Sequence, residues 1–353
     1  MRGRVFQSLL TMPIRKEPDG KPQISEVAPF AAIAGGELQI RGRGFGGLQR
    51  PRVTLGNVEA PIIIGSDSFV IARVPEGVSV GEVVVETGER ASSSRACEIG
   101  VQIADGLHPV ANPAVDRAGN VYTTFSGSRG QKTPVSVYRV DPNFNVKPFL
   151  SDVMNATGLA LDREGLLYIS SRHDGVVYQA DSKGNISVYV EGMGVATGLA
   201  FDEEANLYVG DRSGTIFKIS SARQIYVFAT LEPSIAAYHL AFGPGGYLYV
   251  TGPTTSSFDS VYRISPAGEV EVFYRGLGRP QGLAFDAEDR LYVAASLGGR
   301  RGIVRLDESR SPELFLSGPN IVGLAFTPSS ALMVATSSSL YRVDAGIQGR
   351  PLP

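Results

Sequence analysis

Several residue types that mark common protein classes are scarce in this chain. Tryptophan is absent, cysteine occurs once, as Cys97, and aromatic residues make up only 8% of the 353 positions. One cysteine excludes an internal disulfide framework and any zinc site built from several cysteines. No segment approaches the roughly 18 consecutive apolar residues that a transmembrane helix needs. We therefore expect neither a disulfide-stabilised fold nor a helical membrane protein.

Strong charge of either sign is missing as well. The chain has 33 lysines and arginines against 35 aspartates and glutamates, a net charge of -2, so it lacks the basic field that nucleic-acid binding usually requires. The N-terminus has two early arginines, but its apolar run is broken by Gln7, Ser8 and Thr11 and is followed by no small-residue cleavage site. We expect no nucleic-acid or membrane partner, no signal peptide and, by default, a cytoplasmic location. A true start upstream would leave export open.

Glycine, proline and a repeated phrase are abundant instead. The 42 glycines and 22 prolines indicate many short strands joined by tight turns. The segment TGLAFDEEANLYVGD, which begins at Thr197, recurs in related form along the chain. Successive copies lie 40 to 46 residues apart, with equivalent positions at Asp116, Asp162, Asp202, Gly243, Asp286 and Thr327. A fixed period of this length marks a repeat architecture.

Each repeat contains short runs of β-branched and aromatic residues separated by turn residues. In the copy from Thr197 these runs are TGLAF, LYV, IFKIS and IYVFA, a pattern typical of a four-stranded antiparallel meander. Six meanders with almost no helical periodicity predict an all-β protein with a six-bladed β-propeller, because arrangement around a channel removes the long open sheet edge. The tightest radius would hold the small residue of each first strand: Ala114, Ala160, Ala200, Ala241, Ala284 and Ala325.

The closing of this ring depends on which segment forms the outer strand of the last blade. The segment QGRPLP, from Gln348 to Pro353, aligns with NVKPFL, from Asn145 to Leu150. We therefore predict that the last blade supplies its own outer strand, without strand exchange. The segment from Val5 to Met12 could add an edge strand.

A different pattern precedes the repeats. The alternation in GELQI and PRVTLG indicates strands with one face on a core. With Ile24, Val27 and Pro29, the Gly35-Gly36 turn and the motifs GRGFG, VPEGV and GEVVVET, this part resembles an IPT/TIG domain, which implies an immunoglobulin-like β-sandwich. The predicted organisation is an N-terminal segment (1–22), the IPT/TIG domain (23–103), a linker (104–111) and the propeller (112–353).

The repeats resemble NHL-type repeats and the propellers of the gluconolactonase and regucalcin family. That family holds a divalent cation at the channel mouth with Glu, Asn and Asp ligands placed just before the Gly-Leu pair of the first strands, where the cation would activate water or polarise a lactone carbonyl. The matching positions here contain no carboxylate: Ala111, Thr157, Thr197, Tyr238, Gln281 and Val322. We therefore expect no cofactor. The alternative is Ca²⁺ or Zn²⁺ at the axis, with Asn112 and Asn155 as candidate ligands.

A binding site is predicted on the channel-mouth face that these positions share with the loops after each second strand. The loops place six basic groups against three acidic ones: Arg129, Lys132, Arg172, Arg212, Arg300 and Arg301 against Asp174, Asp211 and Asp259. Such a face suits a small anionic or sugar-like ligand, or a protein partner, although loop charge can also serve solubility alone. The ligand-binding candidates are Asn112, Thr157, Arg172, Thr197, Asp211, Arg212, His239, Gln281 and Arg300.

The sequence favours a non-catalytic binding or scaffold protein with an immunoglobulin-like accessory domain. The alternative is a lactonase-type, metal-dependent hydrolase with a non-standard site around Asn112, Asn155, His239 and Asp211. His239 is the one catalytic candidate, since an imidazole at the channel could act as acid, base or ligand, unless it only fills the core.

Overall fold

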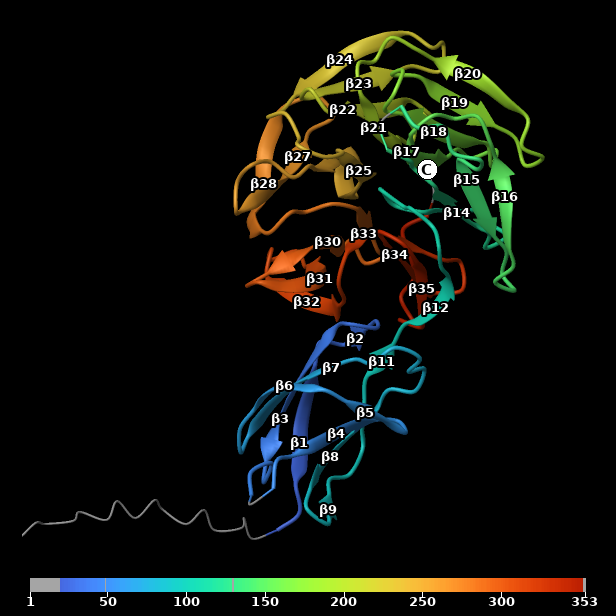
Figure 1. The fold of residues 1–353 in the computed structure, drawn as a ribbon. Helices are drawn as coiled ribbons and strands as arrows, with labels where there is room; N and C mark the ends of the chain where they lie inside the picture. The colour runs from blue at the N-terminus through green and yellow to red at the C-terminus, as the bar shows by residue number, and fades with distance from the viewer. Residues whose placement is uncertain (1–19, 48, 129, 352–353) are drawn as a thin grey trace, which may run out of the picture.

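The computed structural model describes residues 20–351, apart from residues 48 and 129, and shows a two-part molecule built from strands (Figure 1). Helical structure in the described residues is confined to one short 3₁₀ turn, η1 (Pro244–Gly246). None of these residues forms a helix long and apolar enough to cross a membrane. The segment from Val5 to Met12, where an edge strand was considered, lies outside the described residues. The all-β prediction is confirmed.

Two sheets form the N-terminal part. The strands of the first are, in order, β1 (Gln23–Ala28), β3 (Glu37–Arg43), β7 (Phe69–Arg73) and β6 (Ile62–Gly65). The strands of the second are β10 (Arg95–Ala96), β8 (Glu82–Thr87), β4 (Arg52–Leu55) and β5 (Val58–Ala60), with β9 (Arg90–Ala91) beside β8. Alternate side chains of both sheets meet in one core, where Leu38, Ile40, Val53 and Val85 are fully buried. The predicted alternation therefore marks the buried faces of a sandwich.

After residue 100 the described chain forms six sheets around a common axis (Figure 1), which we number in chain order. Their strands, from the axis outward, are as follows: sheet one, β13 (Ala114–Val115), β14 (Val121–Thr124), β15 (Val137–Val140) and β16 (Val146–Leu150); sheet two, β17 (Ala156–Leu161), β18 (Leu167–Ser171), β19 (Val177–Ala180) and β20 (Ile186–Val190); sheet three, β21 (Ala196–Phe201), β22 (Leu207–Asp211), β23 (Thr215–Ile219) and β24 (Ile225–Thr230). The remaining strands are as follows: sheet four, β25 (His239–Phe242), β26 (Leu248–Thr251), β27 (Asp259–Ile264) and β28 (Val270–Leu277); sheet five, β29 (Leu283–Phe285), β30 (Leu291–Leu297), β31 (Arg300–Leu306) and β32 (Pro312–Ser317); sheet six, β33 (Ile321–Phe326), β34 (Leu332–Thr336) and β35 (Leu340–Val343).

The first strands of these sheets form a closed ring. Each first strand contacts the first strand of the next sheet, and β13 contacts both β17 and β33. Closure leaves no open edge at the axis, which is the physical advantage of a propeller over an open sheet. The C-terminal part is therefore a propeller-like ring.

Aromatic rings fasten neighbouring sheets together. The tyrosine of a second strand meets the phenylalanine of the next first strand edge-on, an arrangement that aromatic quadrupoles favour. The pairs and their centroid distances are Tyr168 and Phe201 at 4.8 Å, Tyr208 and Phe242 at 5.0 Å, Tyr249 and Phe285 at 4.7 Å, and Tyr292 and Phe326 at 5.2 Å. The repeated phrase thus supplies both partners of a contact between sheets.

Sheet six is completed by a strand from upstream of the repeats. Strand β12 (Val101–Ala104) pairs antiparallel with β35 as the outer strand, so the prediction of closure without strand exchange is wrong. Val101 and Ile103 are β-branched and suit a strand, whereas the glycine and prolines of QGRPLP do not. Ala104, the first residue of the predicted linker, lies in this strand.

The two parts of the molecule share a sheet. Strand β2 (Ala31–Ala32) pairs parallel with the outer strand β32 of sheet five, and β11 (Glu98–Ile99) pairs parallel with β2. The Ile33 amide donates to the Ser317 carbonyl at 3.0 Å, and Phe30 stacks on Phe315 at a centroid distance of 5.0 Å. The N-terminal part is therefore joined to the ring by backbone pairing as well as by side chains.

Candidate functional site

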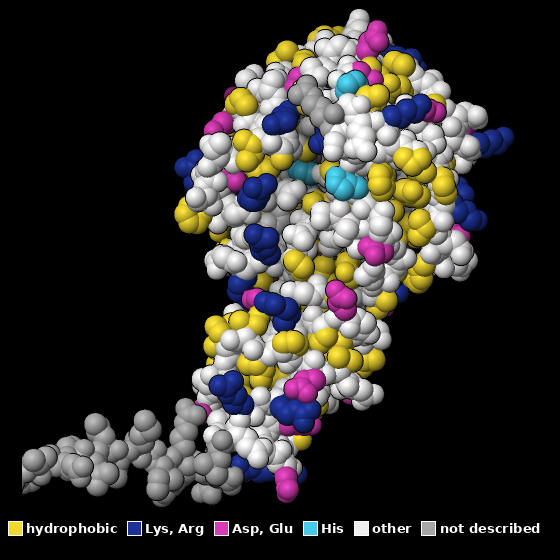
Figure 2. All heavy atoms as spheres, in the orientation of Figure 1, with side chains coloured by type: hydrophobic (Ala, Val, Ile, Leu, Met, Phe, Trp, Pro, Cys, Tyr) yellow, Lys and Arg dark blue, Asp and Glu magenta, His cyan; other side chains and the backbone are white. Residues whose placement is uncertain are grey.

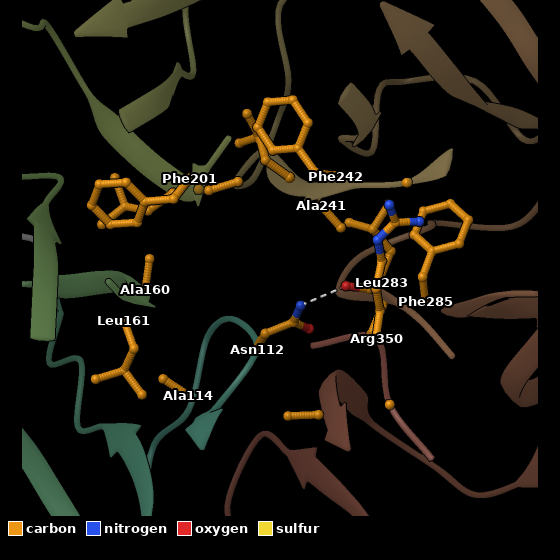
Figure 3. A pocket seen from close by; sticks show the side chains of 18 of the residues that line it. Asn112, Ala114, Ala160, Leu161, Phe201, Ala241, Phe242, Leu283, Phe285 and Arg350 are labelled. Atoms are coloured by element: carbon orange, nitrogen blue, oxygen red, sulfur yellow. Dashed lines mark hydrogen bonds between the residues drawn. The ribbon is translucent and has the colours of Figure 1, made fainter. Parts of the chain in front are cut away.

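A cavity of about 840 Å³ lies at the axis of the ring (Figure 3). Its wall includes the small residue of every repeat: Ala114, Ala160, Ala200, Ala241, Ala284 and Ala325. The prediction that these six alanines surround one axis is confirmed. Larger side chains there would fill the space in which a ligand can sit.

Asn112 lines this cavity and links three sheets. Its Nδ2 donates to the Leu283 carbonyl at 2.8 Å, and its Oδ1 accepts from the Leu324 amide at 3.0 Å. A Cβ atom at Gly282 would come within 2.0 Å of that Oδ1, so the asparagine fits only because glycine stands opposite. Asn112 joins sheets one, five and six, and its amide is largely committed to the wall.

His239 at the start of β25 also lines the cavity, and only 3% of it is exposed. Burial lowers the pKa of the imidazole to about 4 because a charged ring is costly away from water. At neutral pH the ring is uncharged and offers one donor and one acceptor. The corresponding face of the ring is hollowed near its centre, and histidine side chains lie in and beside the hollow (Figure 2).

Thr157 and Thr197, the two threonine candidates, are buried and bonded within the wall. The Thr157 hydroxyl donates to the Asn155 carbonyl at 2.9 Å, and the Thr197 hydroxyl donates to the Gly210 carbonyl at 2.8 Å. The backbone carbonyl of Gln281 accepts from the Thr251 hydroxyl. These three positions support the walls of the channel, and they are not among the residues that line the cavity.

The charged candidates on the mouth face bind loops of the protein. Arg172 Nη2 donates to the Gly127 carbonyl at 3.0 Å, and Arg212 Nε donates to the Ser234 carbonyl at 3.1 Å. Asp211 accepts from the Ser213 amide at 2.9 Å and is buried. Arg129, also counted on this face, lies outside the described residues.

Arg300 faces the joint between the two parts of the molecule. Burial lowers the pKa of its guanidinium, and the charge of Glu37 in the N-terminal part opposes that shift. The structure therefore brings together only Asn112 and His239 at the cavity, out of the nine predicted ligand-binding residues.

The two asparagines considered as metal ligands are hydrogen-bonded to other groups of the protein. Asn155 accepts from the Gly130 amide at 2.8 Å and donates to the carbonyls of Gly127 and Ser128, each at 2.9 Å. Its amide therefore holds a loop, as that of Asn112 holds the wall. Within residues 20–351, apart from 48 and 129, no three or more His, Cys, Asp or Glu side chains are grouped to hold a metal ion.

The opposite end of the cavity carries charged residues that the sequence analysis missed. The first strands lie side by side around the axis, and His239 is the first residue of β25. The C-terminal ends of the first strands therefore lie at the opposite end of the cavity from His239. There Lys218 lies 3.6 Å from Asp202, and Arg350 lies 2.7 Å from Asp289. Arg117, Glu203 and Glu204 complete this rim. For Arg350, the sequence signal was the run of glycine and proline after β35, which predicts a turn better than a strand.

The fold and the cavity define a β-propeller scaffold that carries an N-terminal immunoglobulin-like domain. Residues 22–99 match the IPT/TIG domain family, which confirms that part of the resemblance. The matched range ends just before β12, so the strand that completes sheet six lies outside it.

Solved structures share the fold at low sequence identity. The TM-score is 0.59 to a candidate gluconolactonase, with 16% identity over 73% of this chain and 95% of that chain. It is 0.58 to a gluconolactonase from Xanthomonas campestris, with 15% identity over 72% and 90%. It is 0.55 to an auxiliary nutrient binding protein from Bacteroides thetaiotaomicron, with 12% identity over 92% and 98%. These identities show likeness of fold alone. No curated protein matches the chain.

Proposed function

We propose that the protein is a non-catalytic binding protein that holds a small ligand in its axial cavity. In this proposal the ring is a six-bladed propeller of the NHL or gluconolactonase type, each sheet being one blade, and the IPT/TIG domain is an accessory. The observation that carries the proposal is the cavity of about 840 Å³, a size suited to a small organic ligand. Its wall combines alanine and phenylalanine side chains with Asn112 and His239, and its far end carries a charged rim.

The coverage of the nutrient-binding structure supports a binding role. Residues 101–353 make up 253 of 353 positions, or 72% of the chain, whereas that alignment covers 92%. The likeness therefore extends over most of the N-terminal part as well as the ring. A two-part arrangement similar to this one occurs in a protein named for binding.

The cavity walls indicate the class of ligand. Alanine side chains and the rings of Phe201 and Phe285 offer apolar contact, and the neutral imidazole of His239 offers one donor and one acceptor. Arg172 and Arg212 are held by loop carbonyls. A ligand with an apolar body and few polar groups therefore suits the cavity better than a highly charged one.

The experiment uses N-phenyl-1-naphthylamine, a neutral probe that fluoresces in apolar sites. Ala160 and Ala241 both face the cavity (Figure 3), so the double variant Ala160→Leu, Ala241→Leu should fill it and weaken binding by about tenfold or more. The matched control is Ala118→Leu, at an exposed position. Equal probe binding by the wild type, the control and the double variant would contradict the proposal.

The metal-dependent lactone hydrolase is tested separately. Calorimetric titration with Ca²⁺ and with Zn²⁺ should show no stoichiometric binding, and a panel of lactones should show no hydrolysis that depends on either metal. The reason is that Asn112 and Asn155 are committed to backbone groups. Metal-dependent turnover that is lost in Asn112→Ala would replace the binding proposal with the enzymatic one.

A further inference from the structure

The chain beyond β35 returns to the axis and reaches the cavity. The Ile347 amide donates to the Ser330 carbonyl at 3.0 Å, Gln348 accepts from the Ala287 amide at 2.9 Å, and the Arg350 amide donates to the Phe285 carbonyl at 3.1 Å. Backbone pairing thus holds residues 347–350 beneath sheets five and six.

Close packing fixes this segment further. A Cβ atom at Gly349 would come within 2.4 Å of the Phe326 Cβ, so the backbone lies directly on that side chain. The backbone at residue 350 is therefore placed by its hydrogen bond to Phe285 and by the packing of Gly349 on Phe326.

The Arg350 side chain lines the cavity, beside Phe285 and Leu283 (Figure 3). Its Nη1 donates to Asp289 at 2.7 Å, and the two side chains are 30% and 44% exposed. An ion pair this exposed contributes little to the stability of the fold, and its partners exchange readily. A guanidinium has five N–H donors, so the one bond to Asp289 leaves donor capacity for a ligand.

The other basic side chains of this end are less suited to the role. Lys218 pairs with Asp202, a carboxylate that is only 6% exposed, and lies 5.3 Å from the centre of the Tyr208 ring. Arg117 is exposed on the rim beside Asp116, and Glu203 and Glu204 lie exposed on the same rim. Arg350 therefore combines a place in the cavity wall with a weakly held partner.

We propose that Arg350 anchors the acidic group of an otherwise apolar ligand, a carboxylate or sulfonate whose hydrocarbon body fills the cavity. The planar guanidinium fork matches two oxygens of such an acid, and the alanine and phenylalanine walls match the body. This inference rests on the proposed binding function and adds the anionic class of the ligand. It also moves the anchor from the predicted arginines of the mouth face to the other end of the channel.

The test compares two fluorescent probes with the same apolar body. 1-Anilinonaphthalene-8-sulfonate carries an acid, and N-phenyl-1-naphthylamine does not. Arg350→Gln should weaken binding of the sulfonate about tenfold or more and leave the neutral probe within about twofold. Arg350→Lys should fall between wild type and Arg350→Gln, because an ammonium keeps the charge but loses the fork. Arg43→Gln, in the N-terminal domain, is the matched control and should change neither probe.

A competition arm tests the carboxylate. Decanoate should displace the sulfonate probe from wild type, and 1-decanol should displace it at least about tenfold less well. Loss of this preference in Arg350→Gln is the expected result, and the melting temperature of each variant shows that it is folded.

The two proposals fail in different ways. If Arg350→Gln leaves sulfonate binding unchanged while the double leucine variant weakens both probes, the anion anchor is wrong and the binding function stands. If the double leucine variant affects neither probe, or the wild type binds neither, the binding function fails and the anchor with it.

Discussion

At the scale of single residues, His239 is a titratable group in an almost fully buried position. It replaces the glycine of the repeated phrase, lines the cavity and is nearly fully buried. Burial is the cause of its low pKa, because a charged ring loses its hydration there. The cost of keeping a titratable group there should be visible in the pH dependence of stability.

We predict that the free energy of unfolding contains a contribution from His239 that is lost in acid. The pKa falls from 6.5 to about 4 on folding, so between those values the unfolded chain binds more protons. Stability should therefore decrease as pH falls from about 6.5 to 4, by roughly 3 kcal/mol at most. Chemical denaturation of His239→Gln should lack this part of the slope. His173→Gln, at an exposed position, should retain it, and an unchanged slope in His239→Gln would contradict the assignment.

Which site residues the sequence reveals depends on how local their environment is. Asn112 and His239 stand at repeat positions that face the axis, so the period alone places them at the cavity. Arg172 and Arg212 also stand at repeat positions, but their partners, the carbonyls of Gly127 and Ser234, are set by loop shape. Arg350 belongs to no repeat, and its place depends on backbone bonds to sheets five and six.

At the scale of the structural element, the turn after the first strand has a recurring design in sheets one, two and five. Asp286 is fully buried, accepts from the amides of Glu288 and Arg290, and binds the Arg290 guanidinium and the Tyr292 hydroxyl. Asp116 and Asp162 bond the tyrosine six residues later in the same way. The aspartate of the repeated phrase thus closes the turn and orients the aromatic ring between sheets.

Removing such a carboxylate should be costly. Asp286→Ala leaves several donors without a partner, and we expect a loss of roughly 3 kcal/mol in the free energy of unfolding. Asp307→Ala removes a similar turn carboxylate that is exposed on an outer turn, where it accepts from the Ser309 hydroxyl and the Ser311 amide. That control should lose less than about 1 kcal/mol. Denaturant unfolding measures both losses, and equal values would contradict the larger stabilising role of the buried aspartate.

Most elements of the ring could be predicted because each is specified by its own residues. The runs after Thr197 become β21 to β24 as their alternation and turn residues indicate. The outer strand of sheet six could not be assigned by alignment, since β12 lies outside the repeat and pairs across 236 residues with β35. The local sequence pattern indicates that a segment can form a strand, but it does not indicate which sheet that strand completes.

At the scale of the whole molecule, the joint between the two parts combines backbone pairing of β2 and β32 with apolar packing of Ala31 and Ile33 against the ring. Gly36 is buried at this joint, and a Cβ atom there would come within 2.4 Å of the Ser317 carbonyl oxygen. The same serine accepts from the Ile33 amide and, through its hydroxyl, from the Glu37 amide. A small change at this position should act on the joint and spare both cores.

We predict that Gly36→Ala loosens the two parts without unfolding either. Small-angle scattering should show a larger maximum dimension, and heating should give two separate transitions, because the added carbon displaces β2 from β32. Gly65→Ala is the matched control, since its Cβ would meet only ordinary contacts, the nearest at 3.6 Å. A single transition and unchanged scattering in Gly36→Ala would mean that the joint adapts.

The pairing of β12 with β35 also limits the order in which the nascent chain can fold. Residue 104 leaves the ribosome 236 residues before residue 340, a delay of roughly 12 to 50 seconds at common rates of synthesis. During that interval the upstream strand has no partner to pair with, and the ring stands open. Completion of sheet six therefore has to follow synthesis of the final repeat.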